Sequence, residues 1–224
     1  MRAVRDNALS LVFGVLFIFA LVGQAIAGYL ENNERLSQHG MPLETFAAYV
    51  TSSDFTVDVA ENWQSEFLQF FLFIAATVWL VQRGSPESKK PGEEGPGDDE
   101  DQLVGEYAVA GSPAWAKAGG IRRLIYSNSL LLVMGALFLL SWFAQSLGGT
   151  TVMNEENAEH GQPSITWLQY IASPDFWSRT LQNWQSEFLA VGAMITLSIY
   201  LRQRGSPESK PVGAPHHTTS VSSD

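Results

Sequence analysis

The residues in this sequence that could do chemistry are two glutamates, Glu66 and Glu187, each at the start of an apolar run. Each follows an asparagine by one helical turn, Asn62 and Asn183, which places the amide and the carboxyl group on one helix face. A carboxylate at the edge of a membrane is costly unless it binds a cation, a proton or another polar group. The two pairs are therefore a candidate cation or proton site, with polar contact between helices as the structural alternative.

A second candidate set lies between the apolar runs and combines two imidazoles with two carboxylates: His39, His160, Glu34 and Glu155. Such groups together suit a divalent metal ion. The Glu-x4-His spacing does not place both ligands on one helix face, however, and the sequence has no HExxH motif. We expect no metal here and interpret the histidines as structural or loop-capping residues.

Composition excludes several other chemistries. The chain has 224 residues, no cysteine and a net charge of −10, and 46% of its residues are hydrophobic. Without cysteine it has no disulfide, iron–sulfur cluster or thiol nucleophile, and an acidic chain without a basic stripe is a poor nucleic-acid binder. No nucleophile–base pair, phosphate-binding loop or haem motif is recognisable, so we expect a non-enzymatic protein without a cofactor.

Four apolar stretches indicate an all-α membrane protein with four transmembrane helices. We predict spans at about 8–28, 66–82, 127–148 and 187–203. The first and third are long enough to cross ~30 Å of hydrocarbon. The second and fourth are short, about 25 Å or less of helix between their flanking charges. Charged side chains must therefore lie close to the membrane at these two spans.

The first span also fits a cleaved secretory signal. Residues 1–27 combine a basic start, an apolar stretch and an Ala25-Ile26-Ala27 ending typical of a cleavage site. The apolar run is long for a signal, and an equivalent segment recurs inside the chain as the third span. We therefore favour a retained transmembrane helix.

The basic residues predict the orientation of the spans. Of 13 Lys and Arg residues, all but Arg35 and Arg179 lie before the first span, between the second and third, or at the end of the fourth and beyond it. Basic residues collect on the cytoplasmic side of membrane proteins. Both termini and the central linker are therefore predicted to be cytoplasmic, and the loops with Arg35 and Arg179 to face outward.

The two halves of the sequence are copies of one two-helix unit, 121 residues apart. Residues 62–68 return unchanged as 183–189, and 82–89 return unchanged as 203–210. Such identity indicates a duplication. Because each unit has an even number of spans, both copies insert the same way round, and their pseudo-twofold axis should follow the membrane normal.

The repeat defines the predicted domains: a first unit at 1–90, a linker at 91–120, a second unit at 121–210 and a tail at 211–224. The linker is rich in Gly, Pro and acidic residues, so we predict that it and the tail are disordered. The first spans of both copies retain polar and small residues on one face, which suits close helix packing or a substrate path. These residues are Asn7, Gly14, Gln24 and Gly28, with Asn128, Gly135, Gln145 and Gly149.

The outer loops are predicted to be helical. Ser52 and Ser173 fit N-caps of helices that continue into the second and fourth spans. Shorter amphipathic helices are expected around 42–50 and 163–171, on the outer membrane surface.

The repeated segment Gln-Arg-Gly-Ser-Pro-Glu-Ser-Lys follows the second and fourth spans. Arg83 and Arg204 should mark the level of the lipid headgroups, and Gly84 and Gly205 fit helix C′ caps. The identity between the copies exceeds what a helix stop requires, so a partner or phosphorylation role is the alternative.

The chain resembles a family of uncharacterised bacterial membrane proteins, classed as a domain of unknown function. The resemblance lies in the Asn-Trp-Gln-Ser-Glu-Phe-Leu segments, the segments after the second and fourth spans, and the His-Gly outer loops. The resemblance covers nearly the whole chain except the linker and tail. It implies a multi-pass protein of the bacterial inner (plasma) membrane with no assigned activity, and it supplies no catalytic residues.

We expect a non-enzymatic accessory or structural membrane component, in contact with the lipid bilayer and with copies of itself or another membrane protein. The alternative is a small oligomeric transporter or channel for ions or protons. It would use Glu66 and Glu187, with Gln24 and Gln145, at the pseudo-twofold interface. The spans contain no midplane charge and no Gly/Pro break, which are the usual signs of a transport site.

Overall fold

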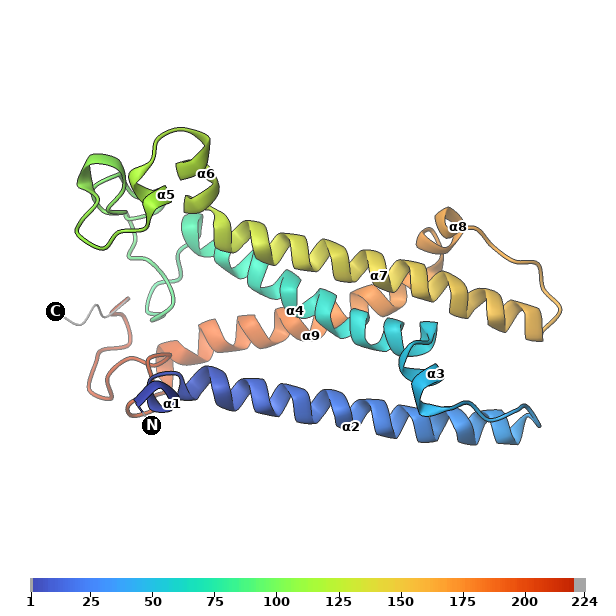
Figure 1. Cartoon of the computed structure of the whole chain (residues 1–224). Helices are drawn as coiled ribbons and strands as arrows, with labels where there is room; N and C mark the ends of the chain where they lie inside the picture. Colours follow the sequence, from blue (N-terminus) through green and yellow to red (C-terminus); the bar gives the residue numbers. More distant parts are fainter. Residues whose placement is uncertain (1, 220–224) are drawn as a thin grey trace. The chain divides into compact units, whose positions relative to one another are not determined.

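The computed structural model describes residues 2–219, and this part of the chain is all-helical, with no β-strand (Figure 1). The predicted all-α class is therefore confirmed. Met1, at the start of the candidate signal, and residues 220–224, at the end of the predicted tail, lie outside the described residues.

The chain divides into two compact units, residues 1–60 with 144–172 and residues 61–143 with 173–224. Helices α4 (Ser53–Trp79) and α7 (Ser129–Glu159) contribute to both units. The other elements of the first unit are α1 (Arg2–Asp6), α2 (Ala8–Gln38), α3 (Phe46–Val50) and α8 (Trp167–Ile171). Those of the second unit are the 3-10 helix η1 (Gly105–Tyr107), α5 (Ala114–Lys117), α6 (Ile121–Ser127) and α9 (Pro174–Tyr200).

Helices α2 and α7 begin where the first and third spans were predicted and continue about ten residues further. Each has 31 residues, or about 46 Å of helix. Among the described residues these are the two helices long and apolar enough to cross a membrane. Their last turns carry charged side chains, because the helix outlasts the apolar stretch by several residues.

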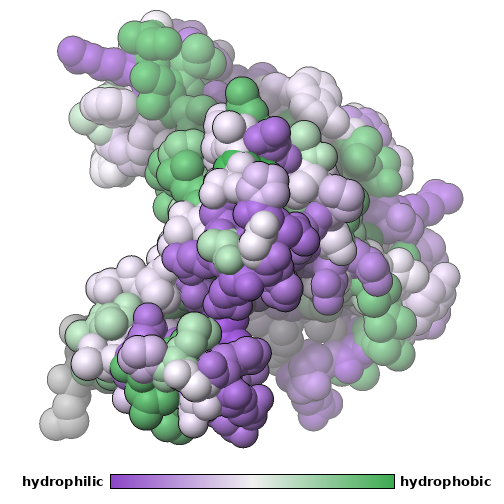
Figure 2. Space-filling model, turned by 90° about the vertical axis from the view of Figure 1, so that its right-hand side faces the viewer, coloured by the Kyte–Doolittle hydropathy of each residue, from purple (hydrophilic) through white to green (hydrophobic). Residues whose placement is uncertain are grey.

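The apolar side chains of these two helices are largely exposed in the structure. All residues from 8 to 20 in α2 are exposed, so the helix is apolar on every side without being covered by protein. A helix of this kind normally lies in a protein core or in a membrane. Figure 2 shows one face of the molecule, on which hydrophobic and hydrophilic residues are mixed. This exposure argues against a core helix and suggests a membrane protein.

The loops after α2 and α7 in the first unit are fixed by the same contacts in both copies. The side chain of Asn33 binds the backbone N–H and C=O of Glu44, at 2.8 and 3.1 Å. Asn154 binds the same two groups of Ile165, at 2.7 and 3.0 Å. An asparagine with one donor and one acceptor matches a peptide edge in this way. The loop is therefore held at a fixed distance from the end of each long helix.

The short helices α3 and α8 are shorter than predicted, beginning near residues 46 and 167 and not near 42 and 163. The side chains of Thr45 and Thr166 cap these helices, each by accepting the backbone N–H of the residue three positions later. Thr166 also forms a full capping box with Gln169. The residues before each threonine have no helical partners and follow an irregular path.

Two tyrosines place α3 and α8 against the long helices. The hydroxyl group of Tyr49 lies over Gly28 of α2, and that of Tyr170 lies over Gly149 of α7. A Cβ atom at either glycine would overlap the tyrosine ring. Two glycines of the predicted packing seam, Gly28 and Gly149, thus each contact a tyrosine of the helix that follows in the chain.

Helices α4 and α9 begin as predicted. Ser52 accepts the backbone N–H of Phe55, and Ser173 accepts that of Phe176, at 3.2 and 3.3 Å. Pro174 occupies the first turn of α9, where its missing N–H costs nothing. Both helices have 27 residues and pass without interruption through the repeated Asn-Trp-Gln-Ser-Glu segment.

The C-terminal ends of these helices differ from the prediction. Helix α4 ends at Trp79 and α9 at Tyr200, so Gly84 and Gly205 are not helix C′ caps. Both glycines do have positive φ, +89° and +82°. They sit within a separate folded loop, which forms its own hydrogen bonds and thereby ends the helix earlier.

Candidate functional site

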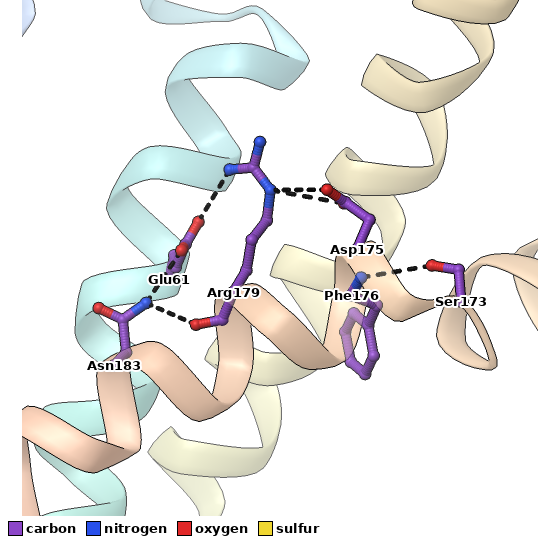
Figure 3. A network of polar contacts seen from close by, with 6 residues as sticks. All are labelled: Glu61, Ser173, Asp175, Phe176, Arg179 and Asn183. Carbon is purple, nitrogen blue, oxygen red and sulfur yellow. Dashed lines mark hydrogen bonds and ion pairs between the residues drawn. The ribbon is translucent and has the colours of Figure 1, made fainter.

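Within the second unit, α4 and α9 run in the same direction, cross each other and are joined by a series of polar contacts (Figure 1). Nearest the start of α4, Glu61 accepts a hydrogen bond from Asn183 Nδ2 at 2.9 Å and pairs with Arg179 Nη1 at 3.4 Å (Figure 3). Glu61 is only 16% exposed, whereas Arg179 is 43% exposed. A half-buried carboxylate needs such partners, because its desolvation is otherwise uncompensated.

Arg179 is itself held by its own helix. Its Nε atom lies 3.4 Å from Asp175 one turn earlier, an (i, i+4) ion pair (Figure 3). The N-cap bond from Phe176 to Ser173 fixes the first turn that carries Asp175. The guanidinium group is thereby directed toward Glu61 by residues of α9 alone.

One turn further along, a buried glutamine joins the two helices. Gln64 is fully buried and its Oε1 accepts the indole N–H of Trp184 at 2.8 Å. Trp184 of α9 packs against Trp142 of α7 in an aromatic cluster between these helices. The indole N–H of Trp142 donates to the Thr180 hydroxyl oxygen at 3.2 Å. The remaining rings of this cluster are Phe138, Phe176, Trp177 and Phe188.

The next contact brings the predicted carboxylates together. Ser65 is buried and its hydroxyl group lies 3.4 Å from Glu187 Oε1. Glu187 is half-buried, Glu66 is exposed, and the two carboxylates are close enough to interact electrostatically. Of the two predicted asparagines, Asn183 joins the Glu61 network, while Asn62 lies exposed one turn before Glu66.

Gln24 and Gln145, the glutamines of the predicted polar face of the first and third spans, lie in the compact unit of residues 1–60 and 144–172. Gln145 is 0% exposed, and neither its Oε1 nor its Nε2 has a hydrogen-bond partner among the described residues. Gln24 is half-buried. An unpaired buried amide costs about 1–3 kcal/mol per group, so Gln145 destabilises this unit.

The outer-loop histidines close the ends of the long helices. His39 Nδ1 lies 2.8 Å from the carbonyl oxygen of Arg35, and His160 Nδ1 lies 2.8 Å from that of Glu156. In this geometry the Nδ1–H tautomer is a second donor to a carbonyl that already accepts the backbone N–H of the same histidine, at 3.2 Å in both copies. Glu34 and Glu155 are exposed, and residues 2–219 contain no group of three or more His, Asp or Glu that could hold a metal ion.

The repeated segments 82–89 and 203–210, here called the exit loops, form the same structure. In each, the first residue donates its backbone N–H to the hydroxyl oxygen of the last serine: Gln82 to Ser88 at 2.7 Å, and Gln203 to Ser209 at 2.9 Å. The inner serine of each loop accepts the N–H of its glutamate at 3.2 Å. In both copies the ammonium group of the last residue, a lysine, donates a hydrogen bond to the backbone carbonyl six residues later. Most of the repeated identity is thus required for the loop itself.

The two exit loops also meet each other. The Glu87 carboxyl group is hydrogen-bonded to Glu208; burial, the neighbouring Glu208 charge and this bond raise its pKa above the usual range. Lys210 is 2% exposed and its ammonium group donates to the carbonyl oxygen of Gly84 at 2.5 Å. Burial and the nearby Arg202 lower the pKa of Lys210.

Sequence reasoning missed the ion pair between Glu61 and Arg179, which joins the two copies. A signal was available, because the copies differ in charge at these places. Glu61 corresponds to Gln182, and Arg179 corresponds to Asp58. The signal becomes informative only when α4 and α9 are known to lie side by side.

These features define a helical protein with two helices able to cross a membrane and an intramolecular polar interface between two others. A family model described as "Domain of unknown function (DUF6766)" matches residues 1–221, and the chain belongs to that family. No curated protein and no solved structure matches the chain.

Proposed function

We propose that this chain is a multi-pass protein of the bacterial inner membrane with four spans, both termini in the cytoplasm, and a non-enzymatic structural or accessory role. The first and third spans lie in α2 and α7, and the second and fourth in α4 and α9. The distribution of 13 basic residues supports the orientation.

The proposed four spans require α4 and α9 to cross the membrane although they are less apolar than α2 and α7. Both enter from the outer side as long helices whose first turns are polar, so only their second halves need to lie in hydrocarbon. The backbone beyond Trp79 and Tyr200 forms turns, and irregular backbone does not lie in hydrocarbon. Two spans this short therefore require a locally thinner bilayer and flanking side chains that reach the headgroups.

Recurring contacts support the tandem repeat and its pseudo-twofold arrangement. The asparagine–loop bonds, the tyrosine over glycine, the histidine at the helix end and the serine cap all recur 121 residues later. The parallel course of α4 and α9 is what a duplication with an even number of spans requires.

The observation that carries the structural role is the polar line between α4 and α9. Glu61, Gln64 and Ser65 each bind a side chain of α9 within the same molecule. Groups used in this way hold helices together and fix their register. The repeated polar residues of these helices therefore act mainly in assembly of the fold, which suits a component that acts through its surfaces.

Ion- or proton-linked transport is the second candidate. One observation favours it, the electrostatic contact of Glu187 with Glu66 beside the Ser65 hydroxyl group. Two carboxylates that repel each other bind a cation or share a proton readily. Four helices offer little room for a path, so this function requires an oligomer.

The experiment that separates the two is purification of the intact chain from native membranes in mild detergent, with mass spectrometry of co-eluting proteins. A structural or accessory role predicts a partner in fixed stoichiometry that is retained by the Glu66→Gln, Glu187→Gln double variant. Transport predicts a homo-oligomer whose ion or proton flux in vesicles is abolished by the same double variant. A chain without partner, oligomer or flux contradicts both.

A further inference from the structure

The two exit loops have the same fold but different surroundings. In the first, the C-terminal tail lies on the loop: Gly84 N–H donates to the Thr219 hydroxyl oxygen at 2.8 Å, and Gly84 O accepts from Lys210. The carbonyl oxygen of His216 also lies against Gly84. In the first loop, the backbone N–H of the glycine thus binds an oxygen acceptor.

The second exit loop is open at the equivalent place. A Cβ atom on Gly205 would meet nothing within 4 Å, and its N–H has no partner among the described residues. Beside it lies a groove of about 550 Å³, lined by residues 204–207 and 209–212. Gly205 lines this groove and has a positive φ of +82°, close to the +89° of Gly84.

The groove combines cationic, hydroxyl and apolar groups. Arg204 is exposed, and Ser206 and Ser209 belong to the lining. Lys210 also lines it, but its ammonium group is bound to backbone carbonyls and contributes only its charge. Val212, 58% exposed, gives the groove an apolar side.

We propose that this groove binds the phosphate of an anionic phospholipid headgroup. An Arg guanidinium beside a free backbone N–H is a suitable donor pair for phosphate oxygens, and the apolar side suits the glycerol and the first acyl carbons. The inference rests on the proposed function, because it requires the end of α9 to lie at the cytoplasmic headgroup level. There Leu197, Tyr200 and Leu201 are exposed and would face lipid.

The local charges favour an anion. Arg204 and Lys210 line the groove, and Glu208 is the carboxylate closest in sequence. The Glu208 side chain is hydrogen-bonded to Glu87, so it is directed to the other exit loop. A phosphate in the groove would therefore meet more positive than negative charge.

The test uses the intact chain purified in a neutral detergent and titrated with dioctanoyl phosphatidylglycerol, with bound lipid counted by native mass spectrometry. Dioctanoyl phosphatidylcholine measures the preference for an anionic headgroup, and glycerol 3-phosphate measures binding of the phosphate without acyl chains. Arg204→Gln removes the guanidinium group. Arg83→Gln is the matched control, because Arg83 is the equivalent residue of the covered loop.

The expected result is one phosphatidylglycerol per chain, at least tenfold tighter than phosphatidylcholine and glycerol 3-phosphate. Arg204→Gln should weaken it tenfold or more, and Arg83→Gln less than twofold. Equal binding of the two lipids, equal binding of glycerol 3-phosphate, or equal effects of the two variants overturns the inference. So does a dimer that dissociates on Arg204→Gln without binding lipid, since the groove would then hold a second copy.

Carbonate extraction of membranes distinguishes this failure from that of the proposed function. If the chain stays in the membrane but shows no lipid preference, only the groove is refuted. If carbonate releases the wild-type chain, the membrane proposal itself is contradicted.

Discussion

Replacing Glu61 by Gln should destabilise the fold, whereas the reciprocal change at the equivalent position should not. Glu61→Gln gives α4 the residue that α9 has at Gln182, and it removes the negative charge from the pair with Arg179. The Asn183 bond to Glu61, 2.9 Å long, becomes a bond to a neutral amide oxygen. The change therefore isolates the contribution of charge at this contact.

The expected magnitude follows from burial. Hydrogen bonds to charged groups contribute about 1.5–3 kcal/mol, and part of this remains with the Gln amide. The ion pair adds less than about 1 kcal/mol, because Arg179 is 43% exposed and screened by solvent. We expect a loss of about 1–2 kcal/mol, which lowers the Tm by roughly 2–8 °C for a chain of this size.

The assay is thermal unfolding of the purified chain in detergent, with Gln182→Glu as matched control. Gln182 is exposed, so the control should change the free energy of unfolding by less than about 0.5 kcal/mol. Adding Arg179→Gln to Glu61→Gln should cost less than Arg179→Gln alone, because the shared contact is already lost. Equal effects of Glu61→Gln and Gln182→Glu, or additive effects of the two pair variants, would refute the assigned contact.

Three further changes test other parts of the structure. Gln145→Leu should raise the Tm, because it removes two unpaired buried polar atoms at about 1–3 kcal/mol each. Gly149→Ala should lower stability by about 1–3 kcal/mol, because the new methyl group overlaps the Tyr170 ring. Stability should fall as pH rises from the usual glutamate range through the raised pKa of Glu87, since the folded state holds that proton more tightly; Glu208→Gln should reduce this fall in a series of melts against pH.

Each of these has its own control and contradicting result. Gly192→Ala places a methyl group where nothing lies within 4 Å, so it should leave the Tm unchanged or higher; a loss as large as that of Gly149→Ala contradicts the contact. A Tm lowered by Gln145→Leu would mean that this amide has a partner outside the described chain. An unchanged pH profile in Glu208→Gln would remove Glu208 as a cause of the raised pKa.

Local sequence signals predicted the parts of the fold that depend on neighbouring residues. The serine caps gave the starts of α4 and α9, and the apolar runs gave α2 and α7. The ends of α4 and α9 were placed too late, because the exit loops satisfy their own backbone groups from Gln82 and Gln203 onward. A sequence pattern shows where a helix can end, but it does not show that a following loop forms its own hydrogen bonds and ends the helix earlier.

The candidate site was predictable only in part. Glu66 and Glu187 do approach each other, as the repeat suggested, and Asn183 takes part in the polar line. The Glu61–Arg179 contact joins residues that are not equivalent in the two copies, and their difference in charge between the copies indicates a contact only once α4 and α9 are known to lie side by side. Contacts of this kind depend on which helix faces which, and one sequence does not contain that information.

The most direct test of the central claim, four spans with cytoplasmic ends, uses the fact that the chain has no cysteine. Single cysteines at the exposed positions Ser37, Ala110, Gln162 and His217 can be labelled with a membrane-impermeant maleimide in intact bacterial cells. We predict labelling at Ser37 and Gln162 in intact cells, and at Ala110 and His217 only after permeabilisation. Labelling of Ala110 from outside, with Gln162 protected, would show that only α2 and α7 cross the membrane and would contradict the four-span proposal.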